Sequence, residues 1–159
     1  MTRMDTQSLA ELRSLPDVSG IGDRRATALH RQFDSVAAMA NAPLEQFDDF
    51  HYVDANTLAE IRDLDHAIES YRETFDELRQ SGTALVGIED ARYPIELREA
   101  HAPILLYARG NVSLLGERGV TFSGSRETEM RGCEWTRTVA SNLADSYVIV
   151  GGGATGVDT

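Results

Sequence analysis

Apolar residues in the first half of the chain recur every three or four positions, which is the spacing of amphipathic helices. Five helices are expected there, over Thr6–Ser14, from Asp23 to Phe33, after Ser35, over Leu44–Phe47, and from Asn56 to Ser81. Pro16 stops the first helix, and Asp23 can cap the second. Gly82 is the expected C-cap of the last helix, which is long and acidic.

After Gly82 the apolar residues form short runs instead, a pattern typical of strands. Four strands are expected, over Thr83–Ile88, Ile104–Tyr107, Val120–Ser123 and Tyr147–Val150. A helical stretch, Cys133–Asp145, separates the last two, and this order begins a parallel βαβ sheet. We therefore expect an α/β chain with an all-helical domain over residues 1–82. An incomplete Rossmann-like parallel sheet is expected over residues 83–159.

The segment between the first two helices, residues 15–22, fits a helix-hairpin-helix turn with Gly20 and Gly22 around a central isoleucine. The glycines let the backbone approach a phosphate, and the second helix points its positive end at the same place. Arg24 and Arg25 can add charge-assisted contacts from the first helical turn. Such binding reads shape and charge rather than bases. The hairpin is also compatible with a purely structural or protein-docking role.

A weak internal repeat of this hairpin, called the echo segment below, lies in Phe47–Ile61. Tyr52-Val53-Asp54 stands there where the first hairpin has Gly-Ile-Gly. The echo is therefore expected to be a second hairpin whose glycines were lost.

Two further loops with glycines follow the last two expected strands. Because the carboxyl ends of parallel strands collect ligands at one sheet edge, the two loops are expected to form one anion pocket. Arg126 offers a planar, bidentate donor for phosphate, and Ser125 offers a hydroxyl group. The candidate ligands are Gly124, Ser125, Arg126, Gly151, Gly152 and Gly153.

The net charge is −11, with 26 acidic residues against 15 basic ones, all of them arginine. Such a balance argues against a nucleic-acid partner, since phosphate contacts dominate that affinity. However, excess carboxylate without lysine is typical of adaptation to high salt, which screens repulsion. The charge is also uneven: residues 43–79 carry −8, whereas residues 16–33 and 118–137 each carry +1. An acidic solvated surface that says nothing of partners remains an equal interpretation.

Several classes of function lack their signatures. No apolar run approaches the roughly 20 residues that cross a bilayer, and the N-terminus has no apolar core of a secretory signal. Cys133 is the one cysteine, and the four histidines have no ligand spacing. No nucleophile–base pair or carboxylate dyad is evident. We therefore expect a cytoplasmic binding protein, not an enzyme, with no cofactor, metal or membrane partner.

Four motifs follow one another along the second half of the chain. They are Asp90-x-x-Tyr93-Pro94-x-x-Leu97, Pro103-x-x-Leu106-Tyr107-x-x-Gly110, Gly124-Ser125-Arg126, and Gly151-Gly152-x-Ala154-x-Gly156-x-Asp158. In this order, and behind a helix-hairpin-helix domain, they resemble the DNA-processing protein A family, also called Smf. The ordered set is far more specific than any single motif.

The resemblance implies a recombination mediator that binds single-stranded DNA by its phosphates and helps load a RecA-type recombinase. It implies a homodimer in the full-length form. Arg126 would be a phosphate contact, with Gly124, Ser125, Gly152 and Gly153 around the pocket.

The chain departs from the family pattern in two ways. Gly151 stands where the family usually has serine, which removes one hydroxyl donor. The family also continues well past the position of Thr159, and half a parallel sheet would leave an apolar edge unpaired. The sequence is therefore expected to be a fragment, a disrupted gene product or a truncation.

Two other interpretations stay open. A nucleotide-processing or nucleotide-sensing enzyme of the related phosphate-binding Rossmann group, which includes the cytokinin-releasing phosphohydrolases, also uses glycine loops after strands. That reading requires a P-G-G-x-G-T-x-x-E motif with a catalytic glutamate, which would lie beyond Thr159. The other is a protein-interaction module in which the hairpin and the acidic helix dock a partner.

Overall fold

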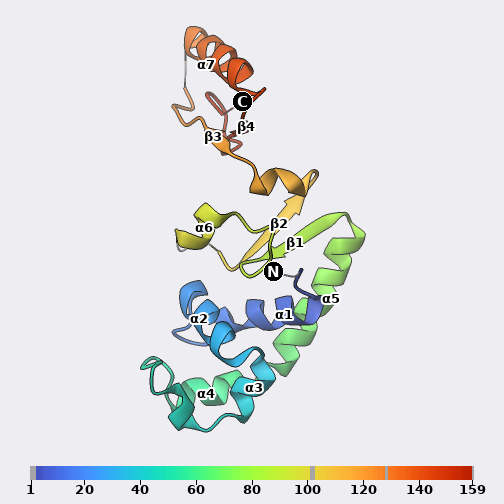
Figure 1. Ribbon diagram of the computed structural model, residues 1–159, viewed down its shortest axis with the longest axis vertical. Helices are drawn as coiled ribbons and strands as arrows, with labels where there is room; N and C mark the ends of the chain where they lie inside the picture. Colours follow the sequence, from blue (N-terminus) through green and yellow to red (C-terminus); the bar gives the residue numbers. More distant parts are fainter. Residues whose placement is uncertain (1–2, 101–102, 128, 159) are drawn as a thin grey trace. The chain divides into compact units, whose positions relative to one another are not determined.

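The computed structural model describes residues 3–100, 103–127 and 129–158. The chain divides into two compact units, residues 1–112 and residues 113–159. Figure 1 colours them from blue to yellow and from orange to red. None of the helices in the described ranges is long and apolar enough to cross a membrane.

The first unit is built mainly of helices, most of them at the expected places. They are α1 (Thr6–Ser14), η1 (Leu15–Asp17), α2 (Asp23–Phe33), α3 (Val36–Asn41), η2 (Leu44–Phe47), α4 (Ala55–Arg62), α5 (Asp65–Gln80) and the short α6 (Ile95–Glu99). Side-chain caps explain several starts, because Asp5 accepts from the Ser8 amide and Ser35 from the Ala38 amide. The helices enclose a core of Leu9, Leu12, Leu15, Leu29, Phe47 and Phe75.

The single long helix expected from Asn56 to Ser81 is wrong, because α4 and α5 are separate helices that break at Asp63 and Leu64. Leu58, Ile61 and Leu64 are all buried and lie three positions apart. In a continuous helix each such step turns the side chain by about 60° away from the core. Because the chain breaks at Asp63 and Leu64, the rotation of α5 about its axis is independent of that of α4. Both helices can therefore bury their apolar side. Gly82 does follow the end of α5 with a φ of 80°, as expected.

The first two strands form an antiparallel pair, β1 (Thr83–Gly87) with β2 (Leu105–Arg109), in which Leu85 lies opposite Tyr107. These two strands are therefore not part of a parallel sheet, contrary to expectation. They belong to the helical unit, because a Cβ on Gly87 would lie 2.7 Å from atoms of Leu9 and Met4. The change from helix to strand occurs at residue 82, but the compact unit continues to residue 112.

The loop after β1 carries the Asp90-x-x-Tyr93-Pro94 motif and has a structural role. Asp90 is 1% exposed, and its carboxylate accepts from the Arg92 amide at 3.0 Å and from two of the Arg92 guanidinium nitrogens. The Arg92 hydrogen bonds lower the pKa of the Asp90 carboxyl. Tyr93 donates its hydroxyl hydrogen to the Pro103 carbonyl. The motif thus ties the end of β1 to the approach to β2.

The second unit contains the expected βαβ arrangement. η3 (Val112–Gly116) spans the division, and β3 (Gly119–Thr121), α7 (Met130–Leu143) and β4 (Val148–Val150) follow. β3 and β4 are parallel, with Val120 opposite Ile149. This confirms the predicted pairing of the last two strands across one helix.

The division of the chain can be tested by limited proteolysis with trypsin. We expect cleavage at the exposed Arg109 or Arg118, which flank the division, and a stable fragment that retains β1 and β2. The reason is that β1 is buried against the helices, so its removal would open their core. Mass spectrometry of the fragment identifies its end. A stable fragment ending before Thr83 would support the domain boundary expected from the sequence instead.

Candidate nucleic-acid interface

The turn between α1 and α2 is closed by two backbone hydrogen bonds, from Val18 to Leu15 at 3.1 Å and from Ile21 to Val18 at 3.0 Å. Gly20 has a φ of 80°, a conformation that favours glycine. Ile21 is 3% exposed and anchors the turn in the core. The two glycines are exposed, so their backbone is accessible from solvent.

The start of α2 differs from the start of α4 in its capping. Gly22 is the N-cap of α2 and has no side chain to offer, whereas the Asp54 carboxylate caps α4 by accepting from the Thr57 amide at 2.8 Å. The expected capping by Asp23 is wrong: Asp23 is the first residue of α2, and its carboxylate accepts from the Ile104 amide at 3.3 Å. The first turn of α2 therefore has no N-cap side chain, whereas that of α4 has one; Asp23 is the acidic residue of the first turn of α2.

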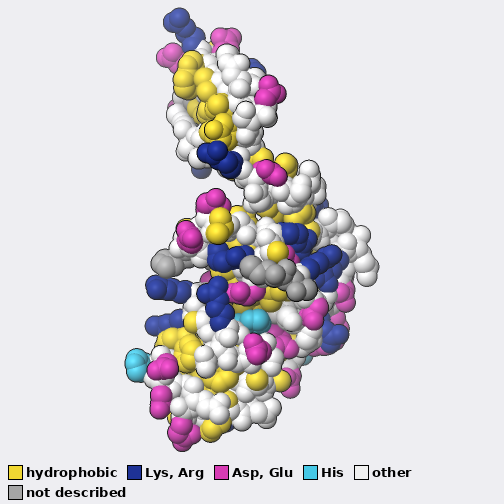
Figure 2. Space-filling model, viewed as in Figure 1, with side chains coloured by type: hydrophobic (Ala, Val, Ile, Leu, Met, Phe, Trp, Pro, Cys, Tyr) yellow, Lys and Arg dark blue, Asp and Glu magenta, His cyan; other side chains and the backbone are white. Residues whose placement is uncertain are grey.

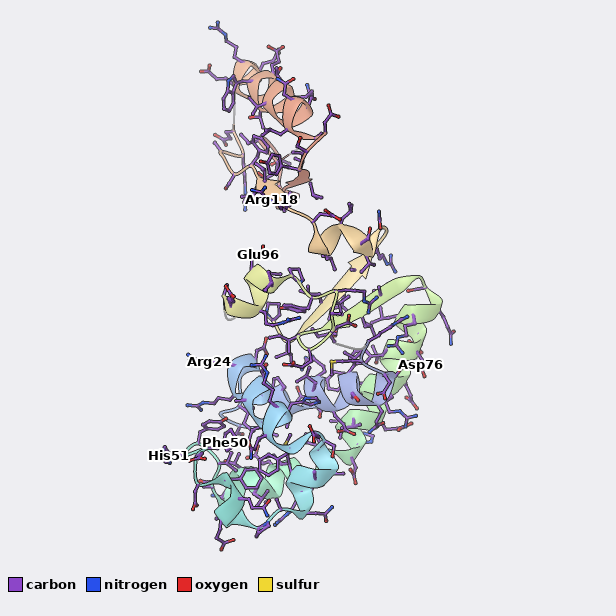
Figure 3. The ribbon with its side chains drawn as sticks, viewed as in Figure 1. Arg24, Phe50, His51, Asp76, Glu96 and Arg118 are labelled. Carbon is purple, nitrogen blue, oxygen red and sulfur yellow. The ribbon has the colours of Figure 1, made fainter. Side chains whose placement is uncertain are left out.

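Arg24 and Arg25 have different surroundings. Arg25 donates to the Gly20 carbonyl at 2.6 Å, and its guanidinium lies 4.5 Å from the centre of the Tyr52 ring. Arg25 therefore braces the turn against the echo segment. Arg24 is exposed and points outward from α2 (Figure 3). Glu60 was not expected here, yet its carboxylate accepts from the Ser19 amide at 2.8 Å.

In the second unit, the loops after β3 and β4 touch each other. A Cβ on Gly124 would lie 2.6 Å from the Val157 side chain. Gly156 has a φ of 94°, and a Cβ there would meet the Ser125 carbonyl and lie 2.9 Å from the Arg126 Cα. The parallel strands thus bring the two candidate loops together.

The glycine loop after β4 is held by Asp158, whose carboxylate accepts from the Gly152 amide at 3.0 Å. The Ser125 hydroxyl oxygen accepts from the Glu127 amide at 3.1 Å, so it shapes its own turn. All six candidate ligands of this edge are exposed. Arg126 is therefore accessible to a large anion beside the loop.

A pocket of about 340 Å³ adjoins this edge and contains a basic residue that the sequence analysis did not single out. Arg137 of α7 lines it together with Ile149, Val150 and Gly156. Its only signal in the sequence was its place in the weakly basic segment 118–137. Among the described residues, no group of three His, Cys, Asp or Glu side chains could hold a metal ion.

Residues 84–159 match the family model described as DNA recombination-mediator protein A. A stretch of 73 residues is 40% identical to a DNA processing protein DprA of Streptococcus pneumoniae, and it covers 45% of this chain and 26% of that relative. The matched segment is therefore similar to proteins described as DNA-processing proteins and recombination mediators. The resemblance predicted from the motifs is confirmed to this extent: residues 84–159, which contain all four motifs, match the model of that family.

The contact between the two loops can be tested at Gly156. We expect Gly156→Ala to destabilise the second unit by about 1–3 kcal/mol, because alanine is strained at this φ and its Cβ meets the neighbouring loop. Hydrogen exchange of the β3 and β4 amides measures the change. Gly116→Ala is the control, because a Cβ there has nothing within 4 Å. Equal exchange in the two variants would contradict the described contact.

Proposed function

We propose that this chain binds single-stranded DNA through its phosphates, as part of a recombination mediator that helps load a RecA-type recombinase. The observation that carries the proposal is the pair of loops, residues 124–126 and 151–156, brought together by β3 and β4 within the segment that matches the family. The matched relative is named as a DNA processing protein.

The chemistry of the loop pair suits a phosphodiester. Glycines let a phosphate approach backbone N–H groups closely, and an arginine adds a bidentate, charge-assisted contact. Neither feature reads a base edge, so binding of this kind tolerates any sequence. Arg126 lies next to Gly156, which is in the same loop as Gly151, Gly152 and Gly153, so both features occur at one sheet edge.

The turn between α1 and α2 is proposed as a separate contact with the DNA backbone. Its support is the uncapped start of α2, with Arg24 exposed in the first turn. This turn lies outside the residues that match the family model, so its role rests on geometry alone.

The net charge of −11 is distributed unevenly along the chain, so it does not repel DNA equally at every site. Residues 43–79, which include α4 and α5, carry −8. Arg126 and the start of α2 lie in segments that each carry +1, and residues 151–156 carry no charged side chain. High salt would screen the distant carboxylates more strongly than a phosphate in direct contact with an arginine.

Recombinase loading and a homodimer of the longer protein are proposed from the family match. Recombinase filament formation on DNA already coated with a single-strand binding protein tests the first. Sedimentation of the longer protein tests the second.

The main test of the proposal is Arg126→Ala. Loss of one charge-assisted contact of about 1.5–3 kcal/mol should weaken binding of all single-stranded sequences alike. The slope of log affinity against log salt should fall by about 0.7. Fluorescence anisotropy with labelled oligonucleotides of unrelated sequence measures both.

Arg126→Lys is the matched variant. It should bind more tightly than Arg126→Ala but less tightly than the unaltered protein, because an ammonium group does not replace the paired N–H donors of a planar guanidinium. Unchanged single-strand affinity in Arg126→Ala would contradict the proposal. If that variant instead abolished turnover of a nucleoside monophosphate, the enzyme interpretation would hold.

The hairpin contact can be tested by giving α2 a cap of its own. Gly22→Asp places a carboxylate where Asp54 caps α4, so it should compete with phosphate and lower DNA affinity without lowering the melting temperature. Gly116→Asp adds the same charge at an open position and is the control. Equal affinities in the two variants would leave the hairpin as a structural element.

A further inference from the structure

The first unit contains a pocket of about 280 Å³ between α2 and α6 that no motif indicated. Three arginines line it, Arg24 and Arg31 from α2 and Arg98 from α6. Thr27, Ile88 and Glu99 complete most of its wall. Figure 2 shows Arg side chains gathered over α2 and around α6, with carboxylates between them.

The two arginines of α2 share one face of the helix. Arg24 and Arg31 lie seven positions apart, which is two turns, or about 10 Å along the axis. Between them on the same face is Ala28, whose short side chain leaves the groove between the guanidinium groups open. Arg24 also belongs to the first turn of α2, so the pocket continues directly from the hairpin.

Arg98 is held in place by neutral groups. Its Nε donates to the Ile88 carbonyl and its Nη2 to the Asp90 carbonyl, both at 2.9 Å. The guanidinium lies 5.9 Å from the centre of the Tyr93 ring. These bonds use carbonyl oxygens, so they fix the side chain without neutralising its charge. A cation fixed in this way loses little entropy when it binds an anion.

Two carboxylates lie near the arginines: Glu99, which lines the pocket and is exposed, and Glu89, which is half-buried. Glu89 accepts from the Arg31 Nε at 2.7 Å, with side chains 31% and 54% exposed. An ion pair that is exposed to solvent contributes little, so a phosphate can displace Glu89 from Arg31. Glu89 therefore lowers the affinity of the pocket for an anion without closing it.

We propose that this pocket binds a second phosphate of the single-stranded DNA backbone, adjacent to the one at the α1–α2 turn. The inference rests on the proposed function, since it names a further subsite for the same ligand. Arg24 and Arg31 contact the phosphate, and Arg98 forms the fixed side of the pocket. Glu89 competes with the phosphate for Arg31.

The test compares two opposite changes in the 159-residue protein, using anisotropy of labelled oligo-thymidine over a range of salt. Arg31→Gln should weaken binding about tenfold and lower the salt slope by about 0.7, and it leaves Arg24 at the α1–α2 turn unchanged. Glu89→Gln should strengthen binding several-fold, because it frees Arg31. Arg72→Gln on α5 is the control, since Arg72 is an exposed arginine that pairs with Glu69. Circular dichroism verifies that each variant is folded.

The outcomes separate the two proposals. If Arg31→Gln binds as tightly as Arg72→Gln while Arg126→Ala loses affinity, the pocket is not a phosphate subsite and the proposed function stands. Weaker binding by Glu89→Gln than by the unaltered protein also overturns the subsite. If the unaltered protein binds no single-stranded DNA at low salt, both proposals are overturned.

Discussion

The approach of Gly156 to the backbone of Ser125 and Arg126 is the constraint on which the candidate DNA site depends. The parallel register of β3 and β4 brings the ends of both strands to one edge, but only a residue without a side chain lets the two loops touch. Asp158 then fixes the glycine loop through the Gly152 amide. The site is thus a consequence of backbone geometry, and Arg126 adds charge to a surface that is already shaped.

Arginine has a second use in this chain besides the proposed contact with DNA. Arg62 donates to the carbonyls of Ala40 and Ala42, Arg98 to those of Ile88 and Asp90, and Arg25 to that of Gly20. A guanidinium has five donors in one plane, so one side chain can satisfy several carbonyls where a turn leaves them without partners. The use of arginine without lysine therefore agrees with the hydrogen bonds from guanidinium groups to the backbone carbonyls of these loops.

The sequence predicted the elements whose causes are local. Ser35 caps α3 by accepting from an amide three residues further on, and the βαβ order needs only a strand, a helix and a second strand. What it missed depends on distant partners. Periodicity does not say that β1 pairs with β2, nor that Arg31 meets Glu89, 58 positions away. The break between α4 and α5 was also missed, because local spacing alone did not show which faces pack inward.

The packing of β1 on α1 also determines the order in which the first unit can form during synthesis. Leu85 and Val86 are buried, Gly87 lies against Leu9 and Leu12, and β1 pairs with β2 along its whole length. The helices leave the ribosome first, but the β1–β2 ladder cannot be complete until Arg109 has emerged. Contacts between such distant residues slow folding, because a long loop must close before they form. The nascent helices therefore expose apolar surface for as long as the intervening loop is being translated.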